Sequence, residues 1–316
     1  MGIKLLNQFL KNNCNNSIYK IGLCHLSNKK IVIDASIYMY RYLGQNALLE
    51  NIYLMICIFR QYNIIPLFVF DGKPPKEKEE LLKERKKNKE FAENEYNILK
   101  DTLHYANKEQ KQQIETKMEV LKKNFIRLHH TDIQNVKNLI QCLGVSYIDA
   151  PGEADKLCAK MVNNNLAYAC VSEDMDMFVY GCKRVLRYLS LLDETVIMYD
   201  LKQILIEINI NFIDFKHICI ISGTDYNIDN KNNLTRTLNY FKKYKKETHD
   251  GNTSFLNWLS NQIDYVDINK INKISKLFNL DNTQELKVYL KTNIINSDIN
   301  MSSLKTILKI ENFIFI

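Results

Sequence analysis

Short runs of consecutive apolar residues predict the strands of a buried sheet. Five such runs stand along the chain, at Lys30–Ile33, Pro66–Phe70, Val145–Ile148, Ala167–Val171 and Val185–Leu189. They lack the alternation of apolar and polar positions that marks a strand with one wet face, and helical patterns separate them. Strands of this kind are typical of a parallel sheet that helices cover on both faces. We therefore expect an α/β domain with a doubly wound, mostly parallel sheet.

The stretch from Pro75 to Gly144 is highly charged and has apolar residues at helical spacing. These residues form two groups, Leu81, Leu82, Phe91, Tyr96 and Leu99, and then Ile114, Met118, Leu121 and Phe125. The spacing predicts two long helices, with Gly144 as a stop signal before the next strand. Because both helices are too polar all round for core elements, we expect them to project from the sheet domain.

The chain beyond Asp225 is rich in Asn and Lys, with weak helical patterns from Leu234 to Lys246 and from Phe255 onward. We expect a small helical subdomain over residues 227–316. The tract from Lys231 to Lys246 carries six basic residues and no acidic one. Such a tract is either a solvated helix face or a contact with nucleic-acid phosphates.

The composition is that of a folded intracellular protein. Hydrophobic residues make up 46% and charged residues 25% of the 316 residues, and the formal net charge of +7 is compatible with a polyanionic partner. The eight cysteines are scattered, without the paired spacing of zinc sites, so we expect reduced thiols, mostly in the core. No apolar run reaches the roughly twenty residues of a membrane span and no secretory signal opens the chain, so we expect a soluble protein that is not secreted.

Acidic side chains follow three of the predicted strands at the point where each strand ends. Asp34 and Asp71 come directly after their strands, and Asp174 and Asp176 follow the third within a few residues. Further acids after loop or helix signals are Glu153, Asp155 and Asp225. Because ligand sites in open parallel sheets lie beyond the carboxyl ends of the strands, we expect these acids to share one small region.

Several carboxylates in one place repel one another unless cations neutralise them. A set of oxygen ligands without histidine or thiolate suits Mg²⁺ or Mn²⁺ better than zinc. Two such ions about 4 Å apart can activate a water molecule and stabilise the leaving oxygen of a phosphodiester. The alternative is that each Asp is a helix N-cap or a turn residue after its strand. Acids at three strand ends at once favour the metal site.

The motifs around these acids resemble those of the flap endonuclease and XPG-type nucleases, over most of residues 1 to about 226. The motifs are Met1-Gly2-Ile3-Lys4, Ile33-Asp34-Ala35-Ser36 with Tyr40, the segments 69–75 and 149–155, Ser172-Glu173-Asp174-Met175-Asp176, and the segment 222–226. Their combination in this order is specific to that family. The resemblance implies a PIN-like nuclease domain over residues 1–226, with an N-region at 1–75, a helical arch at about 76–143 and an I-region at about 144–226.

The resemblance implies two magnesium ions held by seven carboxylates, with manganese as a substitute. One ion would be surrounded by Asp34, Asp71, Glu153 and Asp155, and the other by Asp174, Asp176 and Asp225, with Asp155 placed to bridge. Among these, Asp34, Asp71 and Asp174 are expected to be catalytic. The family usually has Glu where this chain has Asp155, one methylene shorter, so the bridging geometry differs or a water molecule fills the gap.

The resemblance also assigns two catalytic basic residues to the arch, at Lys78 and Arg85. Seven residues are close to two helical turns, which puts both side chains on one face. As fixed cations they would stabilise charge that develops on the scissile phosphate. Without the resemblance, the basic run from Lys83 to Lys89 indicates a solvated helix or a localisation signal.

Contacts with DNA are expected around the arch and in the basic tract. Tyr40 matches a position on which the family stacks a base near the cut, the alternative being a core tyrosine. Gly2 matches an amino terminus that lies near the active site in the family. Further expected DNA contacts are Lys73, Lys86, Arg236, Lys242 and Lys243.

The chain departs from the family pattern in features away from the metal ligands. The stretch between Tyr40 and Pro66 is compact compared with relatives that bind a short 3′ flap, so the resemblance does not carry that pocket over. After Asp225 the Gly-x-Gly hairpin that holds a potassium ion is replaced by residues 227–233, so a K⁺ site is not assumed. No sliding-clamp peptide stands near the carboxyl terminus, and clamp binding is not expected.

The sequence thus predicts an enzyme, a metal-dependent 5′ flap endonuclease and 5′-3′ exonuclease acting on DNA with 5′ flaps, nicks or junctions in replication, repair or recombination. The alternative within the family is a nuclease that processes junctions or double-strand breaks with relaxed substrate choice. A third hypothesis, from another class, is a DNA-binding scaffold without catalysis. We expect a monomer, located in the nucleus, or in the cytoplasm if the protein is viral.

Overall fold

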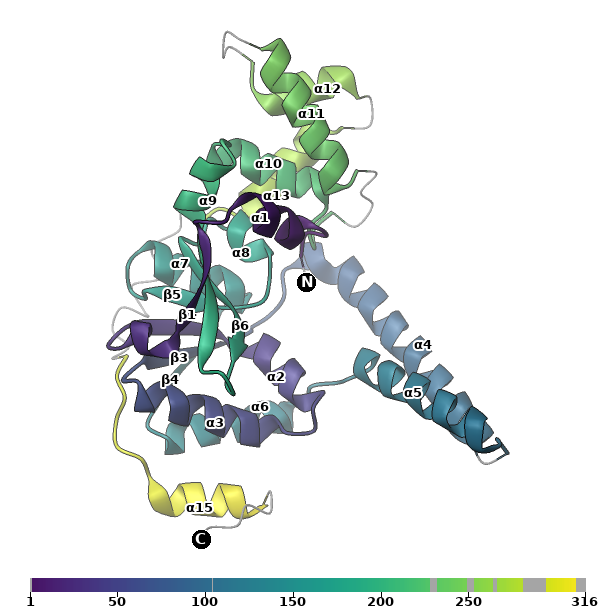
Figure 1. Cartoon of the computed structure of the whole chain (residues 1–316), viewed down its shortest axis with the longest axis vertical. Helices are drawn as coiled ribbons and strands as arrows, with labels where there is room; N and C mark the ends of the chain where they lie inside the picture. Colours follow the sequence, from purple (N-terminus) through teal and green to yellow (C-terminus); the bar gives the residue numbers. More distant parts are fainter. Residues whose placement is uncertain are drawn as a thin grey trace.

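A mixed sheet lies at the centre of the computed structural model, which describes residues 2–103, 105–227, 232–248, 253–263, 266–280 and 294–310 (Figure 1). All five predicted strands are present, and they run parallel to one another. They are β2 (Lys30–Asp34), β3 (Ile65–Phe70), β4 (Ser146–Asp149), β5 (Ala169–Val171) and β6 (Arg184–Ser190). The seven strands of the sheet follow the order β1-β7-β6-β5-β2-β3-β4.

Two antiparallel strands at one edge of the sheet were not predicted. They are β1 (Ile18–Gly22), which pairs with β7 (Thr195–Asp200), and β7 itself, which pairs with β6. Lys20 interrupts the apolar residues of β1, where Tyr19 and Lys20 are exposed. In contrast, β7 contains a run of four apolar residues, 196–199, that was missed in the sequence. The fold class is as predicted, a mostly parallel doubly wound sheet. The two antiparallel strands β1 and β7 extend this sheet at one edge.

Helices cover both faces of the sheet, because alternate residues of the central strands are buried on opposite sides. In β2, Val32 packs with one core cluster, whereas Ile31 and Ile33 pack with the other. The helices on the Val32 side are α1 (Leu6–Asn13), α7 (Ala154–Asn163), α8 (Asp176–Val179), α9 (Leu201–Glu207) and α10 (Phe212–Ser222). The opposite face is covered by η1 (Leu23–Leu26), α2 (Ala35–Leu43), α3 (Leu48–Gln61) and α6 (His130–Cys142).

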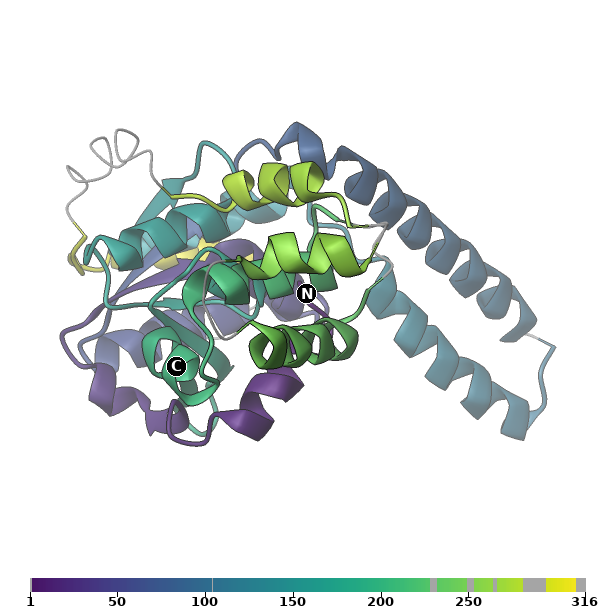
Figure 2. The same ribbon diagram turned by 90° about the horizontal axis from the view of Figure 1, so that it is seen from above.

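Two long helices project from the sheet domain as a hairpin, as predicted (Figures 1 and 2). After a short turn, η2 (Lys76–Lys78), α4 spans Glu79–Leu103 and α5 spans Lys108–Asn124. The rings of Tyr96 and Phe125 pack at a centroid distance of 5.3 Å and join the two helices. The projection ends earlier than the predicted boundary near residue 143, because the third helix, α6, buries an apolar face against α3.

The predicted helical subdomain is built around α11 (Leu234–Glu247), α12 (Phe255–Gln262) and α13 (Ile268–Leu277), which pack on α10. Its core contains the rings of Phe241, Tyr244, Phe255 and Trp258. The last described helix, α15 (Met301–Ile310), does not join it. Leu304 and Leu308 of α15 pack into the sheet domain beside α6, so the boundary at residue 227 does not enclose a single unit.

All eight cysteines are free thiols, as predicted. Five are buried, and Cys24 is exposed, with its sulfur 3.4 Å from Nδ1 of His25. Within the described ranges, no helix has the length and apolar character to cross a membrane.

Candidate active site

The carboxyl ends of β2, β3 and β5 meet at one edge of the sheet, and each of them carries acids. Asp34 is the last residue of β2, and the Ser172 hydroxyl donates a hydrogen bond to its Oδ2 at 3.2 Å. The same hydroxyl accepts a hydrogen bond from the Asp174 amide at 3.2 Å. The amide of Asp176 in turn donates to Oδ1 of Asp174 at 3.0 Å. Ser172 therefore ties the end of β5 to the end of β2.

A second group of acids comes from the amino end of α7. Glu153 is the residue before the first turn of α7, and Asp155 is buried within that turn. The amide of Ala154 donates a hydrogen bond of 2.8 Å to Oδ1 of Asp71, the residue that follows β3. This bond fixes the start of α7 against the strand ends. An acid near a helix amino terminus is also favoured by the helix dipole.

Burial raises the pKa values of four of these acids, and the charges of neighbouring acids add to the effect. Burial raises the pKa of Asp34 well above its usual range, and the charges of Asp71 and Asp174 add to the effect. Burial also raises the pKa of Asp155, with Glu153 adding to it and Lys78 opposing it.

The remaining acids join the same cluster. Burial raises the pKa of Asp176 well above its usual range, and the charges of Asp174, Asp225 and Glu153 add to it. Burial raises the pKa of Asp174 as well, although the hydrogen bond from the Asp176 amide lowers it. Contacts therefore bring acids from the ends of β2, β3 and β5, from the start of α7 and from the loop after α10 into one region.

Two basic side chains from the base of the projecting hairpin reach into this cluster. Lys78 is 8% exposed, and its ammonium forms an ion pair with Glu153 and lies 3.4 Å from Oδ2 of Asp225. Burial lowers the pKa of Lys78, but Asp155 and Glu153 raise it more, so the net shift is upward and the side chain is charged. Arg85 of α4 donates to the same Oδ2 of Asp225 at 2.9 Å. Lys78 of η2 and Arg85 of α4 therefore contact the same carboxylate, although they do not share one α-helix, in contrast to the prediction from their spacing.

An aromatic group beside α7 was missed in the sequence. The hydroxyl of Tyr226 donates to Oε2 of Glu153, and Tyr180 lies 3.5 Å from the same oxygen. The ring of Phe278 packs edge-on against both tyrosines, and the Lys78 ammonium lies 5.1 Å from the centroid of the Tyr226 ring. Tyr226 follows Asp225 directly, and this adjacency could have indicated from the sequence that Tyr226 lies near the acids. The two tyrosine hydroxyls therefore hold Glu153, and the Tyr226 ring packs against the ammonium that pairs with it.

A network of hydrogen bonds around Glu173 was also missed. The Glu173 carboxylate pairs with Arg41 of α2 at 3.0 Å and accepts a bond from the Tyr188 amide at 2.8 Å. The buried Arg187 donates to the Glu173 carbonyl at 2.9 Å and to Asn7 of α1. Glu173 stands between Ser172 and Asp174, so this network fixes the loop that carries two of the seven acids.

The acids at the strand ends suit a hard divalent cation. All their donor atoms are oxygens, the atom type that Mg²⁺ and Mn²⁺ prefer. Oδ1 of Asp176 is buried without a hydrogen-bond partner, which is costly unless a cation or water meets it. In the part of the chain that the structure describes, no three metal-binding side chains enclose a ready-made ion site. Instead, the charges of Lys78 and Arg85 lie against Glu153 and Asp225.

Gly2 lies against the same acids. A Cβ atom at Gly2 would lie 2.6 Å from Oδ1 of both Asp174 and Asp176, and its φ of +73° also favours glycine. Only a residue without a side chain allows the backbone to approach the acids this closely.

A basic cavity of about 750 Å³ lies beside the carboxylates, at the base of the hairpin. Its apolar floor includes Ile37 and Leu82, and Tyr40, 36% exposed, lies in its wall with the Lys89 ammonium 5.0 Å from its ring centroid. The basic residues that line it are Arg41, Arg85, Lys86, Lys89, Lys123 and Arg127. Of the predicted DNA contacts, Tyr40 and Lys86 therefore meet here.

The other predicted DNA contacts lie outside the cavity. Lys73 is exposed on the loop between β3 and η2. The remaining three, Arg236, Lys242 and Lys243, are exposed on α11, and Lys243 lies 3.6 Å from Glu247. The structure does not bring these three into the carboxylate cluster. Most of the segment that replaces the potassium-binding hairpin, residues 228–231, lies outside the described residues.

Comparison with known proteins places these features in one family. Residues 1–92 match the XPG N-terminal domain and residues 144–225 match the XPG I-region. Flap endonuclease 1 of Methanococcus aeolicus is 32% identical over 232 residues, which are 68% of this chain and 68% of that protein.

Solved structures share the fold over nearly the whole chain. The catalytic core of Rad2 in complex with DNA substrate has a TM-score of 0.64 at 18% identity, covering 98% of this chain and 94% of that one. Human GEN1 in complex with Holliday junction DNA has a TM-score of 0.61 at 18% identity, covering 99% of this chain and 74% of that one. At this identity the structures establish the architecture alone, whereas the domain and sequence matches establish descent. The chain belongs to the flap endonuclease family of XPG-type, structure-specific DNA nucleases.

Proposed function

We propose that the protein is a divalent-metal-dependent 5′ flap endonuclease and 5′-3′ exonuclease that hydrolyses DNA phosphodiesters where single and double strands meet. The observation that carries the proposal is the meeting of seven carboxylates with Lys78 and Arg85 at the foot of a projecting helical hairpin. Such a site can hold metal ions on one side of a phosphate and fixed cations on the other.

The carboxylates would hold two Mg²⁺ ions, for which Mn²⁺ can substitute. Asp34, Asp71, Glu153 and Asp155 would bind one ion, and Asp174, Asp176 and Asp225 the other, with Asp155 between them. When bound, the ions supply an activated water molecule and stabilise the leaving oxygen. The family is metal-dependent in general, and the buried, unpartnered Oδ1 of Asp176 supports a cation here.

The side chains on the hairpin side would bind and orient the phosphate. Lys78 and Arg85 carry fixed positive charge next to Asp225, where the scissile phosphate would displace part of their ion pairing. The phosphate would replace the Asp225 carboxylate as the partner of Lys78 and Arg85. These two cations would then stabilise the negative charge that develops as the bond to the leaving oxygen breaks. Lys86 would bind a neighbouring phosphate, and the half-exposed ring of Tyr40 would stack on an unpaired base.

Duplex DNA would reach further along the molecule. Lys73 beside the strand ends, and Arg236, Lys242 and Lys243 on α11, are exposed cations that can bind phosphates without reading the sequence. Gly2 would leave room for the DNA backbone or the metal ions next to Asp174.

Cleavage of labelled DNA tests the proposal. The protein should cut a 5′-flap duplex near its junction in the presence of Mg²⁺ or Mn²⁺, and Asp174→Ala should abolish cutting. No cutting of the flap with either metal would refute the proposal. Unchanged cutting by Asp174→Ala in a clean preparation would refute the metal mechanism.

Cleavage rates on 5′-flap, nicked and Holliday-junction DNA separate the alternative functions. The structural likeness to a protein that binds a Holliday junction, human GEN1, favours a junction-processing nuclease as the second candidate. Faster cutting of Holliday junctions than of flaps would support that candidate. DNA binding without any cleavage would indicate the catalytically inactive scaffold.

A further inference from the structure

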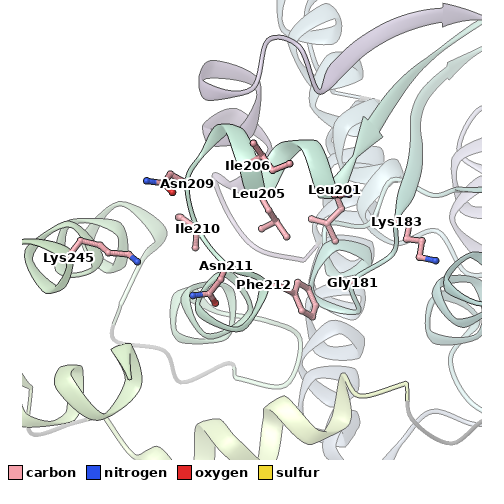
Figure 3. A pocket seen from close by; sticks show the side chains of 11 residues that line it. Gly181, Lys183, Leu201, Leu205, Ile206, Asn209, Ile210, Asn211, Phe212 and Lys245 are labelled. Atoms are coloured by element: carbon pink, nitrogen blue, oxygen red, sulfur yellow. The ribbon is translucent and has the colours of Figure 1, made fainter. Parts of the chain in front are cut away.

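A second pocket, of about 680 Å³, lies between α9 and α10 and faces α11 (Figure 3). Its floor is apolar, formed by Leu201, Leu205, Ile206, Ile210 and Phe212. Figure 3 shows the side chains of Leu201 and Leu205 above the space and the Phe212 ring below it. None of these residues belongs to the carboxylate cluster or to the basic cavity at the hairpin.

The pocket depends on a glycine at a close approach. Gly181 has a φ of +73°, and a Cβ atom there would lie 2.8 Å from Cζ of Phe212. The absence of a side chain at Gly181 therefore lets the Phe212 ring lie in the wall of the pocket. Ile206, one of the residues that line the pocket, is 61% exposed, although isoleucine is usually buried. Solvent therefore reaches part of the apolar surface of the pocket.

The rim of the pocket is positively charged. Lys183, Lys202 and Lys245 reach it from three separate elements, the loop before β6, α9 and α11. The Lys183 ammonium is held in place by a hydrogen bond of 2.9 Å to the Asn163 carbonyl, and the Lys245 ammonium lies 5.4 Å from the Phe241 ring centroid. Among the described residues that line the pocket, none is acidic.

We propose that this pocket binds a short acidic, amphipathic peptide segment of a partner protein. Apolar side chains of the segment would enter the space between Leu205 and Phe212 and cover Ile206, and its carboxylates would meet the three lysines. An apolar anchor with a rim of complementary charge is a common way to bind a peptide. A nucleic-acid backbone fits less well, because charged phosphates would lose their contact with water on an apolar floor that offers them no hydrogen bonds.

The pocket lies away from the carboxylates and from the hairpin, although Lys245 shares α11 with the proposed duplex contacts Lys242 and Lys243. In Figure 1, α9 lies above the strands at the upper left, whereas the hairpin of α4 and α5 projects to the right. The proposal does not rest on the nuclease activity, since it concerns a surface away from the carboxylates.

Selection from a phage library of random peptides, about twelve residues long, tests the proposal on the immobilised full-length chain. Enriched peptides should combine Asp or Glu with Leu, Phe or Trp. A fluorescent synthetic copy should bind the double variant Lys202→Glu, Ile206→Ser at least about tenfold more weakly than the unaltered chain in an anisotropy titration. The matched control, Leu192→Ser with Lys305→Glu, changes an exposed aliphatic residue and an exposed lysine elsewhere and should bind the peptide normally.

Three outcomes would overturn the proposal. The first is a selection without acidic, apolar peptides, and the second is a peptide that binds the pocket variant as tightly as the unaltered chain. The third is a pocket variant that loses affinity for duplex DNA, which would assign the lysines to nucleic acid. Cutting of flap DNA by the pocket variant should equal that of the control, which checks that both variants are folded.

Discussion

The ammonium of Lys78 lies 3.4 Å from Oδ2 of Asp225. Arg85 donates to the same oxygen at 2.9 Å, and Lys78 also pairs with Glu153. The basic residues at the foot of the hairpin are therefore in direct contact with the acids that we propose as metal ligands. The contact couples the position of the hairpin to the charge of the cluster, since cations that enter the cluster compete with Lys78 and Arg85 for the same carboxylates.

Replacing Lys78 by Ala should slow DNA cleavage by about 100-fold to 1,000-fold, the usual effect of removing one fixed charge next to the reacting group. The measurement is the single-turnover rate on a 5′ flap at saturating enzyme. Lys83→Ala serves as a control, because Lys83 is 68% exposed at its side chain and pairs with Glu79 of the same helix. Equal rates for the two variants would show that Lys78 has no part in the chemistry.

Asp155→Glu should keep the enzyme active, because it retains the carboxylate and lengthens the side chain by one methylene. Asp155→Asn should raise the Mg²⁺ concentration for half-maximal rate by about tenfold or more, because ligand charge sets the affinity for hard cations. Asp155 is buried beside Glu153 and Asp174. If the asparagine variant needed no more Mg²⁺ than the native chain, Asp155 would not be a metal ligand.

Without metal, the protein should lose stability as the pH rises. The pKa values of Asp34, Asp155, Asp174 and Asp176 are raised in the folded state, chiefly by burial. The folded state then binds more protons than the unfolded state, so these groups stabilise it below their unfolded pKa and that stability is lost as the pH rises through the folded pKa. Thermal unfolding in a chelator between about pH 5 and pH 8 should show a falling midpoint.

Mg²⁺ should reverse this trend, because bound cations favour the ionised carboxylates and stabilise the folded state by mass action. The same scans with excess Mg²⁺ should give a higher midpoint at the upper end of the pH range than the scans in chelator. A midpoint that is independent of Mg²⁺ at every pH would contradict a metal site among these acids.

Glu173→Ala should destabilise the fold by about 3 kcal/mol, because it leaves the buried guanidinium of Arg187 without its carboxylate partner. Arg187 is 5% exposed, and its Nε lies 3.7 Å from Oε2 of Glu173. Urea unfolding of the variant and of the native chain gives the difference. A loss below about 1 kcal/mol, the value of an exposed ion pair, would mean that the network does not fix the loop before Asp174.

The sequence predicts the central strands and the acid cluster because both depend on local patterns. Buried parallel strands are continuous apolar runs, and each strand end places the next residue at a common edge, so Asp34 and Asp71 could be brought together without coordinates. The edge strand β1 lacks that pattern because Lys20 interrupts it, whereas β7 has a short apolar run that was overlooked. Their pairing depends on long-range register, which no short segment encodes.

Contacts between distant segments account for the other differences. The polar residues of α6 resemble those of the hairpin, and only its packing against α3 shows that Val136, Leu139 and Ile140 are core residues. The aromatic group at Glu153 joins Tyr180, Tyr226 and Phe278 from three parts of the chain. Arg41 meets Glu173 across 132 positions. None of these pairs has a spacing in the sequence that would reveal it.

The most direct test of the account is a crystal structure of the protein soaked in Mn²⁺, with the anomalous signal used to locate the metal. The account predicts two Mn²⁺ ions about 4 Å apart at the carboxyl ends of β2, β3 and β5, with Asp155 between them. Asp34 and Asp176 should each bind an ion directly. An anomalous map without a metal peak among these carboxylates, at Mn²⁺ concentrations that support cleavage, would contradict it.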